Sequence, residues 1–162
     1  MRTVEKDILT ATRPPRLAET PDGAGIWVSC EIAGVVEFID PRTLTITGKL
    51  EFAPHGVRKS EVMPVDIAIT RDGKTAWVAL GRANRVAEVD VPTHTVRGYV
   101  LVGSRPWGLR LTSDEKLLYV TNGLSDDVTV IDTAEREPIR SVPVGRVPYG
   151  VLIDDAPVPG EQ

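Results

Sequence analysis

Apolar and polar residues alternate over short stretches along most of the chain. In the stretch 107–112, Trp107, Leu109 and Leu111 fall on one face of an extended strand, and the residues between them fall on the other. Turn signals such as Asp72-Gly73 separate successive stretches. No segment of any length has the period of a helix. The pattern predicts an all-β chain of short antiparallel strands.

The same series of strands recurs three times. A shift of 42 residues places the copy over 71–112 on the copy over 113–154 without a gap, and a shift of 50 residues places an earlier copy on the middle one. Trp27, Trp77 and Tyr119 then share one position in the second strand. The 8 extra residues of the first copy lie in the stretch E-F-A-P-H-G-V-R-K-S-E-V-M.

The third strand of each copy is apolar on both faces. In the stretch 128–132, Val128 and Val130 fall on one face and Ile131 on the other. A sheet packed between two neighbouring sheets shows this pattern, whereas a sheet covered on one side alternates. Repeats of 40-odd residues that read as four short strands are typical of a β-propeller with four-stranded antiparallel blades. Glu37 and Glu88 do not fit the apolar pattern.

The repeat also divides the chain, and both ends stop inside a blade. We expect residues 1–13 to be the last strand of a preceding incomplete blade, 14–63 a blade with the insertion, 64–105 a blade, 106–147 a blade, 148–154 the first strand of the closing blade, and 155–162 a flexible tail. The prediction is a partial propeller with about three complete blades plus two single end strands. Since propellers generally close with four to eight blades, three arrangements remain open. The chain is the C-terminal half of a longer product, pairs with a polypeptide that carries the missing propeller half, or forms a homo-oligomer; the first is preferred.

Composition adds limits on partners and location. Hydrophobic residues make up 41% and charged residues 26% of the chain, which is a normal globular mixture. The net charge of −4 gives no overall attraction to nucleic acid or to anionic lipid. The single cysteine, Cys30, cannot form an internal disulfide. No apolar run has membrane-spanning length, and the first ten residues do not read as a signal peptide, so the chain is expected in the cytoplasm if expressed as written.

The stretch L-Y-V-T-N at 118–122, followed by V-T-V-I-D, resembles the YVTN family of β-propeller repeats. The runs P-H-G-V, L-G-R-A-N-R and V-G-S-R-P-W-G-L extend the likeness to one subgroup, the PQQ-dependent catabolism-associated β-propeller proteins, over roughly Pro14 to Asp155. This resemblance implies a periplasmic protein that accompanies quinoprotein alcohol oxidation and has no established activity of its own. A quinoprotein or a cytochrome is the partner that it implies.

In a propeller, the loops before the first strand and the loops between the second and third strands share one face around the channel. Here these loops carry arginines, aromatic rings and polar side chains that would suit an anion, a quinone carboxylate or an acidic partner surface. The predicted rim consists of His55, Arg82, Asn84, Arg85, Arg105, Trp107, Asn122, Asp126, Arg146 and Tyr149. The competing interpretation, which we prefer for the two rings, is that Trp107 and Tyr149 pack between blades as core.

Other candidate chemistry is sparse. His55, in the insertion, is the best single candidate, but a lone histidine makes a poor metal site, and His94 reads as a solvated turn residue. Asp40, Asp90 and Asp132 recur once per copy and are interpreted as turn caps rather than as catalytic acids. Cys30 has no histidine near it in sequence, so no nucleophile is predicted. No cofactor is predicted either, because Thr47-Gly48-Lys49 matches the blade motif of PQQ-binding dehydrogenases only faintly and once.

Three functions follow, in order of preference. The first is a non-catalytic binding or scaffold propeller, accessory to periplasmic quinoprotein oxidation. The alternative is part of a propeller enzyme, either a quinoprotein dehydrogenase or a lactonase, which would need a cofactor or a metal. The second alternative is a nucleic-acid-binding propeller, which the acidic isoelectric point of about 5.2 disfavours.

Overall fold

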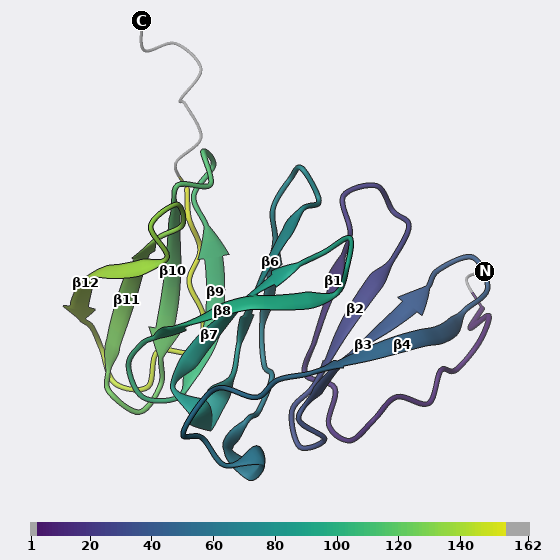
Figure 1. The fold of residues 1–162 in the computed structure, drawn as a ribbon, viewed down its shortest axis with the longest axis horizontal. Helices are drawn as coiled ribbons and strands as arrows, with labels where there is room; N and C mark the ends of the chain where they lie inside the picture. Colours follow the sequence, from purple (N-terminus) through teal and green to yellow (C-terminus); the bar gives the residue numbers. More distant parts are fainter. Residues whose placement is uncertain (1–2, 155–162) are drawn as a thin grey trace, which may run out of the picture.

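Residues 3–154 of the computed structural model are described here, and they form an all-β molecule (Figure 1). Three antiparallel sheets of four strands each follow one another in sequence order. The first sheet contains β1 (Arg16–Glu19), β2 (Ile26–Cys30), β3 (Val35–Asp40) and β4 (Thr45–Glu51). The second contains β5 (Ile67–Ile69), β6 (Thr75–Ala79), β7 (Arg85–Asp90) and β8 (Thr95–Leu101); the third contains β9 (Pro106–Leu111), β10 (Leu117–Asn122), β11 (Asp127–Asp132) and β12 (Glu137–Pro143).

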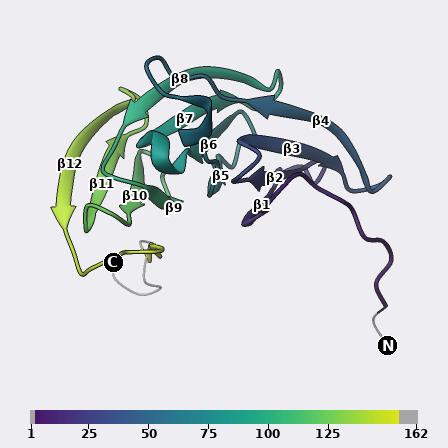
Figure 2. The ribbon, with the colours of Figure 1, turned by 90° about the horizontal axis from the view of Figure 1, so that it is seen from below.

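The three sheets are arranged as the blades of a propeller. Figure 2 shows them side by side around an arc, with β1, β5 and β9 on the concave side and β4, β8 and β12 on the convex side. Each blade carries an irregularity at the same place in its third strand, after Phe38, Glu88 and Val130 respectively. Such a bulge increases the local twist, which lets the outer strand curve around the blade. The predicted partial β-propeller of four-stranded blades is confirmed.

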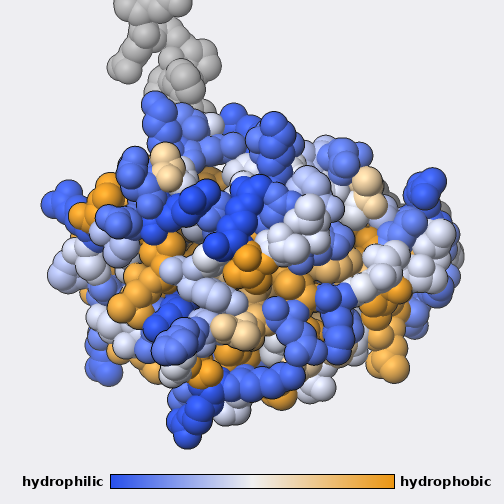
Figure 3. All heavy atoms as spheres, in the orientation of Figure 1, coloured by the Kyte–Doolittle hydropathy of each residue, from blue (hydrophilic) through white to orange (hydrophobic). Residues whose placement is uncertain are grey.

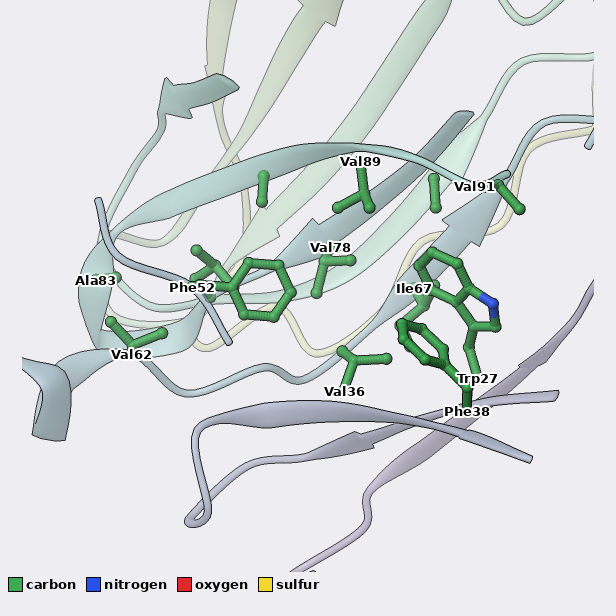
Figure 4. Packing of buried hydrophobic residues seen from close by; sticks show 13 residues of the cluster. Trp27, Val36, Phe38, Phe52, Val62, Ile67, Val78, Ala83, Val89 and Val91 are labelled. Carbon is green, nitrogen blue, oxygen red and sulfur yellow. The ribbon is translucent and has the colours of Figure 1, made fainter. Parts of the chain in front are cut away.

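The hydrophobic core lies between the blades, because each sheet covers its neighbour. Trp27 of the first blade is 1% exposed and packs on Ile67 and Val78 of the second blade (Figure 4). Trp77 repeats this role between the second and third blades. Figure 3 shows apolar side chains in a band across the outer face, with hydrophilic side chains above and below it, where the loops lie.

Regular structure other than strand is confined to two short 3₁₀ turns in the described part of the chain. The first, η1 (Lys59–Glu61), lies in the insertion, and the second, η2 (Gly81–Ala83), joins β6 to β7. Among residues 3–154 there is no helix with the length and hydrophobicity needed to cross a bilayer.

The two single end strands do not belong to any sheet. Residues 3–13 run along the outside of the first blade, where Ile8 and Ala11 pack on its apolar side chains. Residues 148–154 also lie outside the three sheets. A strand requires a hydrogen-bonded partner strand, and within residues 3–154 neither segment pairs with one. The tail predicted over 155–162 lies outside the described residues.

The two glutamates that broke the apolar pattern are both held by partners. Glu88 is 4% exposed, and its carboxylate pairs with Arg97 (3.5 Å) and Arg136 (2.6 Å). A buried carboxylate persists only when it is paired in this way. The Glu37 carboxylate accepts a hydrogen bond of 3.0 Å from the Ala11 backbone N–H. Glu88 therefore joins the second and third blades, and Glu37 holds the N-terminal segment.

Candidate functional site

The loops at one end of the blades meet around a buried carboxylate. Glu31 follows β2 and is 5% exposed. Its Oε2 lies 3.2 Å from Nε of Arg13, and its Oε1 accepts a hydrogen bond of 3.2 Å from Nη2 of Arg105. Arg105 stands just before β9 of the third blade, 74 residues along the chain. The pair therefore links the first and third blades across the inner end of the second.

Local backbone structure fixes the position of Arg105. The residue has a positive φ of 57°, an uncommon conformation that needs support from its surroundings. Its N–H donates to Oδ1 of Asn84 (2.9 Å), and its carbonyl oxygen accepts from the Gly123 N–H (3.0 Å). The guanidinium lies 5.6 Å from the centre of the Trp107 ring. Arg105 is thus held by groups from two blades, with its side chain 16% exposed.

Two aromatic rings continue this surface. Trp107 and Tyr149 meet edge to face, with ring centres 5.4 Å apart. The guanidinium of Arg16, from β1, lies 5.4 Å from the Tyr149 ring. A Cβ atom on Gly123 would come within 2.8 Å of the Trp107 ring, so only glycine leaves room for it. We call Arg13, Glu31, Arg105, Trp107 and Tyr149 the channel mouth.

A second buried acid lies on the inner strands. Asp66, just before β5, is 7% exposed. Its Oδ1 accepts from the Ile67 N–H (3.0 Å) and its Oδ2 from the Leu109 N–H (2.9 Å). Nearby guanidiniums are those of Arg16 (3.9 Å) and Arg110 (3.7 Å). Each of the two buried acids therefore lies beside two guanidiniums, those of Arg13 and Arg105 at Glu31 and those of Arg16 and Arg110 at Asp66.

The structure brings together only part of the predicted rim. Arg105, Trp107 and Tyr149 are in contact, and Asn84 supports them through the Arg105 backbone. His55 is exposed on the insertion and makes no hydrogen bond, ion pair or ring contact with the described residues. The other predicted side chains make different contacts: Arg82 and Arg146 are exposed, Arg85 donates to the Ala83 carbonyl, Asp126 accepts from the Val147 N–H, and Asn122 is fully buried and donates to Thr129.

The preferred interpretation of the two rings as core is not what the structure shows. Tyr149 is 57% exposed, and Trp107 is only partly buried, whereas Trp27 and Trp77 are each 1% exposed. The reason is positional, since Trp107 lies at the start of the inner strand β9 and Tyr149 follows the last strand, while Trp27 and Trp77 lie in the second strands of their blades.

His94 is not a simple solvated turn residue. Its ring stacks on Phe38 of the preceding blade, with centres 3.8 Å apart, and meets Trp27 edge to face at 5.5 Å. Partial burial against these rings lowers the pKa of His94 below its usual value. The three residues help to line a cleft of about 650 Å³ at the opposite end of the blades from the channel mouth.

The recurring aspartates cap turns, as the pattern indicated. Oδ1 of Asp40 accepts from the Arg42 N–H at 2.7 Å, and this backbone hydrogen bond is the main cause of a lowered pKa at Asp40. Oδ2 of Asp90 accepts from the Thr93 N–H (2.9 Å), and Oδ1 of Asp132 from the Ala134 N–H (2.9 Å). Within residues 3–154, no group of three or more His, Cys, Asp or Glu side chains is placed to hold a metal ion.

Sequence reasoning missed most of the charged half of this surface. Arg13, Glu31, Asp66 and Arg110 are not part of the predicted rim. One signal was present, since Glu31 and Asp66 are acids inside otherwise apolar stretches. An acid in such a position is normally paired, and each arginine partner lies in a different strand or loop.

Comparison with known proteins supports the fold. No protein-family model matches the chain, and no curated protein does. Hydrazine synthase of Kuenenia stuttgartiensis superposes with a TM-score of 0.76 at 26% sequence identity, over 92% of this chain and 42% of that one. A protein of Bacteroides fragilis described as a candidate 6-phosphogluconolactonase superposes with a TM-score of 0.73 at 22% identity, over 90% of this chain and 43% of that one.

A third solved structure, the WD40 repeats of RRP9, matches with a TM-score of 0.66 at 18% identity, over 86% of this chain and 44% of that one. The chain therefore spans about two fifths of the length of the structures that it resembles. These neighbours are propeller proteins, which agrees with the fold class of this chain.

Proposed function

We propose that the chain is a non-catalytic propeller module whose channel mouth binds an anionic group, a carboxylate of a quinone or of a partner protein. The observation that supports this is the Glu31 carboxylate, which holds Arg13 and Arg105 at 3.2 Å each. Guanidiniums fixed in this way lose little freedom when they bind a carboxylate, and adjacent rings favour a flat ligand. We further propose that the module accompanies periplasmic quinoprotein alcohol oxidation, with a quinoprotein or cytochrome as its partner, as the resemblance to PQQ-associated propellers implies.

Titration with PQQ, a tricarboxylate quinone, tests the proposal, with tryptophan fluorescence and calorimetry as the readouts. Saturable binding is expected, and it should weaken about tenfold or more in Arg105→Gln, because a charge-assisted hydrogen bond contributes about 1.5–3 kcal/mol. The matched control is Arg140→Gln, which removes an exposed arginine on β12. Citrate is the second carboxylate probe in the same titration. If neither PQQ nor citrate binds, or if both variants weaken binding equally, the channel mouth is not an anion site.

A second candidate function is supported by the comparisons. Hydrazine synthase and candidate 6-phosphogluconolactonases are among the structural neighbours, which favours a propeller-enzyme segment as the alternative. Hydrolysis of 6-phosphogluconolactone by the purified chain, measured against the spontaneous rate, would separate the two. An increase in rate that Glu31→Gln abolishes would favour the enzyme; an unchanged rate would favour the binding module.

A further inference from the structure

The blades contact one another through a position that differs in chemistry at each interface. His94, Arg136 and Leu44 occupy the same place in the turn between the third and fourth strands, and all three have a positive φ of 53–61°. His94 of the second blade stacks on Phe38 of the first. Arg136 of the third blade pairs with Glu88 of the second at 2.6 Å. In each case, the turn residue extends from one blade onto the third strand of the blade before it.

The partner residues also share one position. Shifts of 50 and 42 residues relate Phe38 to Glu88 and Glu88 to Val130. Ring therefore meets ring at the first interface, and acid meets base at the second. Two positions of this set have no counterpart inside the chain, namely Leu44 on the first blade and Val130 on the third. Both side chains are aliphatic, so they are chemically complementary, as are the aromatic pair and the ion pair at the two internal interfaces.

A second feature is also left over at each end. Trp27 and Trp77 pack against four aliphatic or alanine positions on the next blade, and Tyr119 takes their place on the third blade, the last one among the described residues. The corresponding four positions on the first blade are Leu17, Ile26, Val28 and Ile39. With Leu44, these side chains line a cavity of about 380 Å³. We call this surface the first open face, and Tyr119, Val128 and Val130 the second open face, in which Tyr119 and Val128 are half-buried and Val130 is 6% exposed.

From this complementarity we infer that two copies of the chain associate about a two-fold axis, with the second open face of each copy against the first open face of the other. Tyr119 then enters the aliphatic cavity of the partner copy, and Val130 meets the partner's Leu44. A two-fold arrangement forms both contacts at once and closes a ring of six blades. Six lies within the range of four to eight blades in closed propellers.

The N-terminal segment is held weakly enough to move aside. Lys6, Asp7 and Ile8 form one wall of the cavity, and within the described chain residues 3–9 make no hydrogen bond that ties them to the blade. Leu9 is 94% exposed. Association would replace the contacts of residues 3–9 with a full blade interface.

Charge variants at the matched pair test the arrangement in the full-length chain. Sedimentation equilibrium of the wild type should give twice the chain mass of 17.6 kDa. Leu44→Arg alone and Val130→Glu alone should each weaken association about a hundredfold or more, because each buries a charge without a partner. An equimolar mixture of the two variants should associate again, since one interface then carries an Arg–Glu pair and the other keeps Leu44 and Val130.

Leu101→Arg is the matched control, because Leu101 is 60% exposed on β8 of the middle blade; this variant should remain a dimer. Leu44→Asp, at a partly exposed turn, provides a dissociating variant that leaves the core unchanged if Val130→Glu fails to fold. A wild type that stays monomeric, a mass other than two chains, or variants that do not restore association on mixing would each overturn the inference. Monomer alone would indicate that another polypeptide covers the open faces.

Discussion

At the scale of single residues, buried acids tie the blades together more specifically than apolar packing does. Asp66 accepts the Leu109 N–H from the next blade and lies between two guanidiniums. Glu31 and Glu88 have the same role at other interfaces. Apolar side chains tolerate sliding, whereas a buried carboxylate must meet its donors, so these acids fix how neighbouring blades are aligned.

Removing the Asp66 carboxylate should therefore cost stability. We expect Asp66→Ala to lower the free energy of unfolding by about 1–3 kcal/mol, because it leaves the buried Leu109 N–H without an acceptor. Urea unfolding followed by circular dichroism measures the change. Glu5→Ala, at an exposed position of the N-terminal segment, should alter stability by less than about 0.5 kcal/mol. Equal effects of the two substitutions would contradict the role given to Asp66.

Cys30 should make stability sensitive to alkaline pH. Burial, and secondarily the Glu37 carboxylate, raises the pKa of this thiol from 9.0 to about 11. The folded state therefore holds the proton more strongly, and the associated stability is present below pH 9 and lost as the pH rises toward 11. Urea midpoints between these limits should fall more steeply for the wild type than for Cys30→Ala. Parallel pH profiles for the two proteins would show that the thiol does not titrate in this way.

At the scale of elements, the turn that joins β6 to β7 depends on close backbone approach. Gly81 begins η2 with a φ of 50°, and a Cβ there would lie 2.8 Å from the Met63 carbonyl oxygen. Gly56, in the insertion, also has a positive φ (76°), but a Cβ there would meet nothing within 4 Å. Substitutions at these two glycines therefore distinguish the cost of a left-handed backbone from the cost of steric overlap.

Alanine substitutions at these glycines should differ in their effect. Gly56→Ala should cost about 1–2 kcal/mol through its left-handed backbone alone. Gly81→Ala should cost about 1–3 kcal/mol more, because the added methyl group overlaps the Met63 backbone. Thermal and urea unfolding of both variants provide the comparison. Similar losses at the two positions would mean that the chain around Met63 moves freely.

The elements were predictable because each blade repeats the same hydrophobic pattern, and the aligned tryptophans marked the blade interfaces. The site was less predictable, since Glu31 and Arg105 meet across 74 residues, with no local pattern that relates them. Asn122 was misplaced on the rim although it aligns with Leu80, a fully buried position. An apolar residue at the same position of another copy is thus a sign that a polar residue near a loop is buried.

At the scale of the whole molecule, the same capped turn joins the first and second strands of each of the three blades. A hydrogen bond from the Thr20 hydroxyl lowers the pKa of Asp22, the Thr70 hydroxyl does the same for Asp72, and the Lys116 N–H does so for Asp114. The carboxylates are exposed, so each contributes little alone, but the contribution is distributed over all three blades.

Acid should consequently destabilise the blades together. The folded pKa values lie below the unfolded value of 3.8, so the stabilisation is present above pH 3.8 and is lost as the pH falls through the folded values. Urea midpoints measured from neutral pH downward should fall in this window, and the fall should be shallower for Asp72→Asn. An unchanged slope in this variant would mean that the turn carboxylates do not contribute.

The turn residues Leu44, His94 and Arg136 also affect the order in which blades assemble. Copies of a duplicated repeat begin with identical contacts, so any blade can replace any other during folding, and misordered or exchanged structures compete with the native one. Once the three positions differ, a wrong neighbour places the Glu88 carboxylate against an aliphatic or aromatic side chain, and the buried carboxylate loses its ion pair with Arg136. Divergence at two residues per interface is then sufficient to make misassembly unfavourable, while the strands themselves remain nearly interchangeable.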